Sequence, residues 1–226
     1  MTERGEDSST PLGERNAPPV LTVGPTPTDL ATALTHLPSR MRTVGPERSH
    51  PSERPHPPLV ELGEQTMVPP NLAADRPRTG VEFHLPADRR YLTVAAPLSY
   101  YLGATVRADT NRPYLQTPDG EYPLSPLPEF QHEVADLLQD VFYLDALVRE
   151  VPGEATACRR GFVGELGLNP RGLLGASLGA RLDAYLDADR EALADERPDW
   201  HLATYAAPSD ETVRCLPFLL DALSLV

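Results

Sequence analysis

The segment Pro128–Glu150, PEFQHEVADLLQDVFYLDALVRE, carries the long regular hydrophobic pattern around which the chain is organised. Its apolar residues are spaced for one buried stripe on a helix; they are Phe130, Val134, Leu137, Leu138, Val141, Leu144 and Val148. Pro128 suits the first turn because its missing N–H is not needed there, and Glu129 favours the positive end of the helix dipole. A helix of about 20 residues spans about 30 Å, the width of a small domain. We therefore expect the rest of the fold to pack on it, with the polar side chains His132, Asp136, Gln139 and Asp140 away from the buried stripe.

Short strands and helices are expected before this segment. Val20–Val23 is strand-like, and the following helix is predicted to begin at Pro27 with Thr26 as its cap. Met41–Val44 would then be a second strand, which would complete a short β-α-β unit. The further predicted elements are strands at Leu59–Leu62, Val81–Leu85, Ala104–Arg107 and Arg112–Gln116, a helix over Asp88–Tyr101, and a hairpin turn at Thr117–Gly120.

Mostly helical elements are expected after it. The predicted elements are a turn or two of helix around Phe162–Leu168, helices over Leu174–Leu186 and Asp189–Asp195, a strand-like stretch at His201–Ala206, and a last helix capped by Ser209. The predicted fold class is therefore α/β, with mixed α+β as the alternative: a long central amphipathic helix packed with short strands and several shorter helices.

The distribution of proline and polar residues predicts the domain organisation. Residues 1–18 are expected to be a disordered tail, 19–44 a short βα segment, and 45–58 a Pro/Arg/His-rich linker or loop. Residues 59–226 would form the main α/β domain. Its last residues, Leu223–Val226, alternate like half of a strand, so we expect the domain to be truncated there; a terminus tucked into a sheet edge is the alternative.

Composition indicates an acidic, salt-adapted surface. The 226 residues carry a formal net charge of −13 and include neither lysine nor isoleucine. A halophilic, archaeal cytoplasm accounts for these features, and an ordinary acidic protein from a GC-rich bacterium is the alternative. Acidity disfavours nucleic acid and anionic membranes as partners. No apolar run approaches a membrane span of about 18 residues, so a cytoplasmic protein is expected. Cys158 and Cys215 are expected to be buried small hydrophobes.

One short motif points to chemistry. Gly175–Gly179 fits G-x-S-x-G, in which Ser177 would be the nucleophile of a serine hydrolase. No β-branched strand precedes it, and no HGG-type oxyanion loop exists. His201 is the single following histidine, and Asp183, Asp187, Asp195 and Asp199 are the candidate third members. The alternative is that Ser177 caps a helix over Leu178–Leu186.

Other polar groupings match functional patterns only in part. His132 and Asp136 could chelate zinc from one helix face, but no third ligand is suitably spaced. His201 and Cys215 could form a Cys–His dyad, although nothing local activates the thiol. The remaining weak candidates are His50 and His56 in the proline-rich stretch, Trp200, and the glycines Gly161, Gly164 and Gly167, which lack the spacing of a phosphate loop. The sequence therefore predicts no catalytic, cofactor-binding or metal-binding residue and no cofactor.

Four blocks together resemble a known group of proteins. They are Leu98–Gly103 (LSYYLG), Pro128–Asp136 (PEFQHEVAD), Pro198–Leu202 (PDWHL) and Leu216–Ser224 (LPFLLDALS). They resemble the region upstream of the catalytic part in uncharacterised haloarchaeal proteins with a C-terminal caspase-like CHAT domain. The resemblance covers roughly residues 80–226. The family's catalytic histidine and cysteine would lie in the later domain, so no catalytic residue is carried over.

The resemblance implies a non-catalytic structural or regulatory N-terminal module. Such a module would contact either its own C-terminal domain or another protein chain. Two alternatives remain: a serine hydrolase that uses Ser177, and a stand-alone protein-binding module with residues 45–58 as a docking peptide.

Overall fold

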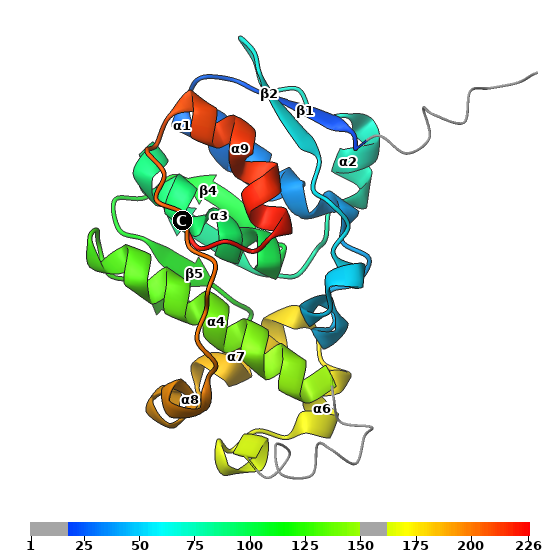
Figure 1. Ribbon diagram of the computed structural model, residues 1–226, viewed down its shortest axis with the longest axis vertical. Coiled ribbons are helices and arrows are strands. Elements are labelled where there is room, and N and C mark those ends of the chain that lie inside the picture. Colours follow the sequence, from blue (N-terminus) through cyan, green and yellow to red (C-terminus); the bar gives the residue numbers. More distant parts are fainter. Residues whose placement is uncertain (1–17, 150–161) are drawn as a thin grey trace, which may run out of the picture.

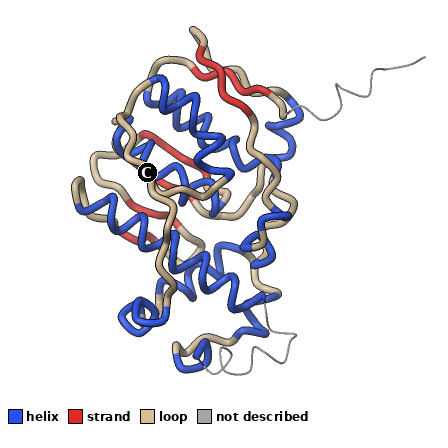
Figure 2. The backbone as a smooth tube through the Cα atoms, viewed as in Figure 1, coloured by secondary structure: helices blue, strands red, loops and turns tan. Residues whose placement is uncertain are grey.

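The computed structural model of this chain describes residues 18–149 and 162–226 (Figures 1 and 2). The predicted tail over 1–18 therefore lies outside the described residues except for Pro18, and so do Cys158 and Gly161. The described part confirms the predicted fold class, since it mixes helices with two small sheets. Its helices are α1 (Pro27–His36), α2 (Pro70–Asp75), α3 (Arg89–Leu102), α4 (Glu129–Arg149), α6 (Pro170–Leu174), α7 (Leu178–Leu186), α8 (Arg190–Glu196) and α9 (Asp210–Asp221).

The two sheets have different topologies. Strands β1 (Val20–Val23) and β2 (Leu59–Leu62) form a two-stranded parallel sheet. The second sheet has the order β4-β3-β5-β6 and contains β3 (Glu82–Leu85), β4 (Thr105–Ala108), β5 (Tyr114–Gln116) and β6 (Glu121–Pro123). The pairing of β3 with β4 is parallel, whereas β5 and β6 form the antiparallel hairpin predicted around the Thr117–Gly120 turn.

The predicted strand at Met41–Val44 is wrong. This stretch contains no strand, and the parallel partner of β1 is β2, in the register Val20↔Leu59. The physical reason is that its backbone is bonded to the segment that follows it: the Arg42 amide donates to the Glu53 carbonyl over 3.2 Å. The parallel crossover therefore runs through α1 and the whole of residues 37–58 before the chain returns to the sheet.

Exposed sheet edges are covered in two places. The Thr35 hydroxyl, on α1, accepts a 2.9 Å hydrogen bond from the Val106 amide of edge strand β4. On the other sheet, Thr22 of β1 exchanges two backbone hydrogen bonds with Met67, of 3.1 and 3.0 Å. Each contact satisfies backbone groups that would otherwise invite pairing with another chain.

Helix α4 confirms the helix predicted for the central segment. More of its surface is buried than the hydrophobic pattern indicates. The predicted stripe is buried, from Phe130 at 0% exposure to Val148 at 0%. Asp140 was expected on the polar side but is only 5% exposed, and Asp145 is 0% exposed. The reason is that α7 and α8 also pack against α4, on faces outside the predicted apolar stripe (Figure 1). The extra covered faces carry carboxylates, which must then be paired.

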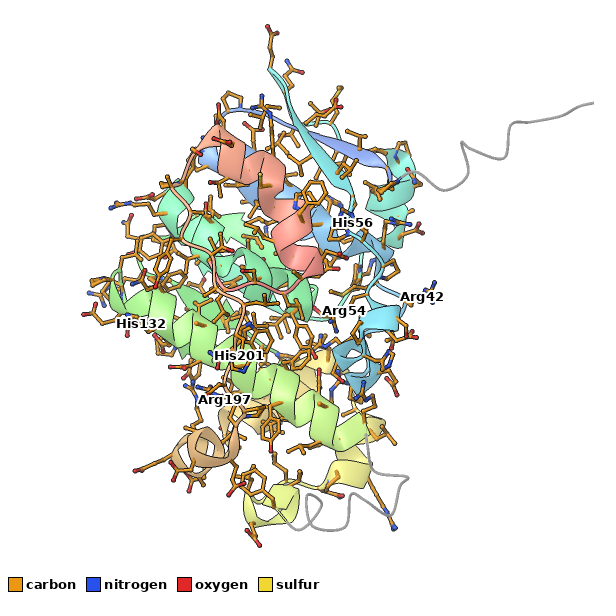
Figure 3. All side chains as sticks on the ribbon, viewed as in Figure 1. Arg42, Arg54, His56, His132, Arg197 and His201 are labelled. Atoms are coloured by element: carbon orange, nitrogen blue, oxygen red, sulfur yellow. The ribbon has the colours of Figure 1, made fainter. Side chains whose placement is uncertain are left out.

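The segment 45–58 is packed against the rest of the molecule. It contains two short 3-10 helices, η2 (Pro46–Ser49) and η3 (Pro51–Glu53), and its Arg48 is 1% exposed. The guanidinium of Arg48 lies 4.3 Å from the centre of the Tyr101 ring. Arg54, labelled in Figure 3, lies 5.7 Å from the ring of Phe142. The two arginines of this segment therefore point inward.

The Asp145 carboxylate is the point where four segments meet. Its Oδ2 accepts hydrogen bonds from Arg48 Nε (2.8 Å) and the Tyr101 hydroxyl (3.0 Å). Its Oδ1 accepts from Arg181 Nε (3.3 Å) and the Tyr185 hydroxyl (3.0 Å). Arg181, only 1% exposed, also donates to the carbonyls of Ala176 (3.0 Å) and Val44 (2.6 Å). One carboxylate thus joins η2, α3 and α7 to α4, and we call these five side chains the Asp145 cluster.

Burial and charge keep the members of this cluster in defined protonation states. Burial raises the pKa of the Tyr101 and Tyr185 hydroxyls, and the nearby Asp145 charge raises both pKa values further. Burial lowers the pKa of Arg48, but the charge interactions and hydrogen bonds with Asp145 and Tyr101 together outweigh it, and the net pKa is raised. Both tyrosines are therefore neutral donors and Arg48 is a cation at neutral pH.

Replacing Asp145 with asparagine is expected to destabilise the protein by about 3–5 kcal/mol, because two buried guanidinium groups lose their counter-charge. The free energy of unfolding from denaturant titration measures this. The matched control is Asp199→Asn, an exposed position that should change stability by less than about 0.5 kcal/mol. Equal, small effects of the two substitutions would contradict a structural role for Asp145.

The raised pKa of Tyr185 predicts a loss of stability in alkali. Since the folded-state pKa lies above the unfolded value of about 10, the contribution of Tyr185 is complete below that pH and declines as pH rises through and above it. The midpoint of thermal unfolding should therefore fall more steeply above about pH 10 in the wild type than in Tyr185→Phe. Tyr205→Phe is the control, because Tyr205 is fully exposed. Parallel curves for all three proteins would refute the assignment.

Candidate functional site

Residues 197–208, here called the strap, connect α8 to α9 and cross α4 (Figure 1). At its start Arg197 donates to Asp140 Oδ1 over 2.6 Å and to Asp136 Oδ1 over 2.9 Å. In the middle, Trp200 Nε1 donates to the Leu223 carbonyl over 3.2 Å. The strap is therefore held to α4 at one end and to the last residues of the chain further along.

The Arg197 contacts explain why Asp140 can be buried. Its second carboxylate oxygen accepts from Arg190 Nε over 3.1 Å, and Arg190 also donates to the Tyr122 hydroxyl over 3.1 Å. Burial lowers the pKa of Arg190, but the neighbouring Tyr122 and Asp140 outweigh it and the net pKa is raised. Two arginines thus neutralise Asp140 and fix the path of the chain through α8 into the strap.

A groove of about 540 Å³ lies between the strap and the C-terminal half of α4. Its apolar wall includes Phe142, Ala146, Leu147 and Trp200. The rings of Phe142 and Trp200 meet edge to face with centroids 5.2 Å apart, an arrangement that favours a rigid wall. Leu202, which also lines this groove, is 52% exposed.

A second groove, of about 650 Å³, lies on the other part of the strap, beside α3 and the start of α4. Val94, Leu127, Ala203 and Leu225 are among its apolar lining residues. Tyr205 also lines it, and its side chain is 103% exposed, as in an extended peptide. The strap therefore presents an aliphatic and an aromatic side chain to solvent, each beside an apolar groove.

The surroundings of the strap are acidic. Residues 195–211 contain five carboxylates and one arginine, and that arginine is ion-paired with Asp136 and Asp140. Asp195, Glu196, Asp199, Asp210 and Glu211 are all exposed. On the far rim of the second groove Arg90 pairs with Asp88 over 2.6 Å, and Arg89 pairs with Asp210 over 2.6 Å. The net charge around the grooves is negative.

Ser177 is a helix cap. Its hydroxyl accepts a 3.3 Å hydrogen bond from the Ala180 amide at the N-terminus of α7, as the capping alternative predicted. Among the described residues its side chain makes no hydrogen bond to a histidine, and α6 rather than a strand precedes it. His201 lies on the strap, apart from α7. In the described ranges, the surroundings of Ser177 are those of a helix cap.

The second glycine of the G-x-S-x-G match has a packing role. A Cβ at Gly179 would lie 2.7 Å from Pro118 Cγ and Cδ and 3.2 Å from the Thr79 carbonyl oxygen. At Gly175 a Cβ would meet no atom within 4 Å. The motif therefore combines a cap with a close approach of α7 to the Thr117–Gly120 turn.

The other candidate residues do not converge. His132 and His201 are exposed and project from separate places along α4 and the strap (Figure 3). The Oδ1 of Asp136 is ion-paired with Arg197 over 2.9 Å. Within residues 18–149 and 162–226, no group of three or more His, Cys, Asp or Glu side chains could hold a metal ion.

The prediction that Cys215 is buried is wrong, because it is exposed on α9. Val213, Leu216 and Leu220 form the buried face of that helix, and Cys215 falls on the opposite side. Within residues 18–149 and 162–226, no hydrogen bond joins His201 to Cys215. His50 accepts from the Ser52 amide over 3.3 Å as the cap of η3, and the His56 ring lies 5.2 Å from that of Phe218.

Comparisons with known proteins add no assignment. No protein-family model, curated protein or solved structure matches the chain. None of the helices in the described ranges is long and apolar enough to cross a membrane. The grooves and the strap are the surface features of the described residues that could contact a partner. Sequence reasoning missed them because they depend on two chain segments meeting α4, although the run Trp200-His201-Leu202-Ala203-Thr204-Tyr205 between two acidic stretches was a local signal.

Gly179→Ala is expected to destabilise the protein by about 1–3 kcal/mol, since the added methyl group must displace Pro118 or the backbone at Thr79. Gly175→Ala, at the other end of the same motif, should be neutral or stabilising by up to about 1 kcal/mol, because it only restricts the unfolded chain. Chemical denaturation of both variants measures the difference. A nucleophile-elbow role for the motif would instead predict comparable losses at the two positions.

Proposed function

We propose that this chain is a non-catalytic protein-contact module that binds a segment of a partner protein along the strap. The observation that carries the proposal is the fully exposed Tyr205, with the half-exposed Leu202, between two apolar-lined grooves of about 650 and 540 Å³. Tyrosine is enriched among residues that dominate binding energy at protein interfaces. Apolar grooves bordered by polar residues are typical of such surfaces.

Charge indicates the chemistry of the partner. The five carboxylates of residues 195–211 favour a segment that carries Lys or Arg beside its apolar residues. A second copy of this chain fits less well, because the net charge of −13 and the same acidic rims would be brought together. The partner is therefore a different segment, apolar at its centre and basic at its flanks.

The location of that segment follows from the sequence resemblance. In haloarchaeal proteins of the CHAT type, a caspase-like domain would follow the region that this chain resembles. A basic, apolar segment of that domain, or of a separate protein, is the proposed occupant. The module would then have a structural or regulatory role, and the peptidase-like chemistry would reside in the other domain.

Selection of short random peptides displayed on phage against the full chain tests the proposal. Enriched peptides should combine apolar and basic residues, and their affinity should fall about tenfold or more in the variant Leu202→Ser/Tyr205→Ser. Met67→Ser is the control, because Met67 is a 63%-exposed hydrophobic residue away from the strap. The proposal fails if no peptide is enriched, or if both variants bind the enriched peptides as the wild type does.

A further inference from the structure

The strap has one paired and one open backbone edge. Ala203 forms a parallel bridge with Leu225, in which the Leu225 amide donates to the Leu202 carbonyl over 2.9 Å and the Thr204 amide donates to the Leu225 carbonyl over 2.7 Å. In an extended chain the amide and carbonyl of one residue point to the same side, and successive residues alternate sides. The amide and carbonyl of Ala203 therefore face away from Leu225.

That outward edge is available. Ala203 is exposed, and no residue of the described ranges makes a hydrogen bond to its amide or carbonyl. One edge of each regular sheet differs from it, because Thr35 binds the Val106 amide at the edge of β4, and Met67 bonds to Thr22 of β1. An unprotected strand edge is a template for pairing with another chain.

We propose that the partner segment binds as an added β-strand on the open edge of the strap at Ala203. This inference rests on the proposed function and specifies its binding mode. Main-chain hydrogen bonds to Ala203 supply register, and the first groove, beside Leu202, receives side chains of the added strand.

The same geometry specifies the pattern of the ligand. Side chains of a strand alternate between its two faces, so the residues that face α4 are apolar. The residues between them face the carboxylates around the strap, of which Glu196 and Asp199 lie at the first groove. The ligand is an extended peptide in which apolar residues alternate with Lys or Arg, and it carries no proline where it pairs with Ala203.

N-methylation of a peptide selected on the full chain distinguishes a strand from a helix. In a strand, methylation of every second amide removes the donors that face the strap and should weaken binding about tenfold or more, while methylation of the intervening amides should change it about twofold or less. In a helix bound in the groove, methylation in either register disrupts the same internal hydrogen bonds. Fluorescence anisotropy of the labelled peptides measures both.

Substitution of Ala203 gives the complementary test. Ala203→Pro removes the outward amide and should weaken binding of the unmethylated peptide about tenfold, whereas Ala203→Ser keeps the amide and should bind as the wild type does. Should Ala203→Pro fail to fold, the methylated peptides on the wild-type chain decide alone. Equal effects of the two methylation registers overturn the added strand and leave the proposed docking function standing. Failure of any peptide to bind overturns both.

Discussion

The buried carboxylate of Asp145 is the constraint on which the rest of the structure depends. It accepts four hydrogen bonds, from two guanidinium groups and two hydroxyls, at distances between 2.8 and 3.3 Å. A buried ion costs several kcal/mol in desolvation, so the arrangement is stable only with all its partners in place. Two arginines exceed one carboxylate in charge, and the structure offsets this with carbonyls for Arg181 and the face of Tyr101 for Arg48. The segments that supply these groups must therefore fold together.

This constraint links two parts of the surface of α4: the part that contacts the Asp145 cluster and the part that contacts the strap. On one side of α4, Asp145 binds groups from η2, α3 and α7. Nearer the start of the helix, Asp140 and Asp136 hold Arg197 at the start of the strap. Phe142 lies between these two levels, in contact with the Tyr101 ring at 5.7 Å and the Trp200 ring at 5.2 Å. The wall of the first groove is thus an extension of the buried cluster. A surface positioned in this way can bind a partner without a large loss of conformational freedom, which favours affinity.

Local sequence signals predicted most of the secondary structure. Thr26 and Pro27 begin α1, Asp88 caps α3, and Ser209 caps α9, each through the side-chain or backbone features that such positions require. The central helix α4 was predicted correctly because its leucine and valine residues recur at helical spacing along one face. The strand at Met41–Val44 failed because strand formation depends on a partner, and the partner of β1 comes only after the 45–58 segment.

The candidate site could be predicted far less well, for a physical reason. Whether Arg48, Asp140 or Asp145 is buried depends on ion pairs between residues up to 97 positions apart, and such pairs have no local pattern. From sequence alone, a charged residue is expected to be exposed, since charged side chains are seldom buried unless they are paired. The capping role of Ser177 was predicted as an alternative from local sequence, whereas the contact of Gly179 with Pro118 depends on tertiary packing. The path of the strap depends on contacts with distant residues, Arg197 with Asp140 and Ala203 with Leu225, which no local pattern predicts.

Native-state hydrogen exchange tests the dependence on Asp145 most directly. If the buried cluster joins these segments, the amides of Arg48 and His50 in the segment 45–58, of Arg181 in α7 and of the centre of α4 exchange through one common opening with one free energy. That shared protection falls together in Asp145→Asn. Exchange of the 45–58 amides many times faster than that of α4, and unaffected by the substitution, would contradict the account, because the segment would then be a surface loop independent of the core.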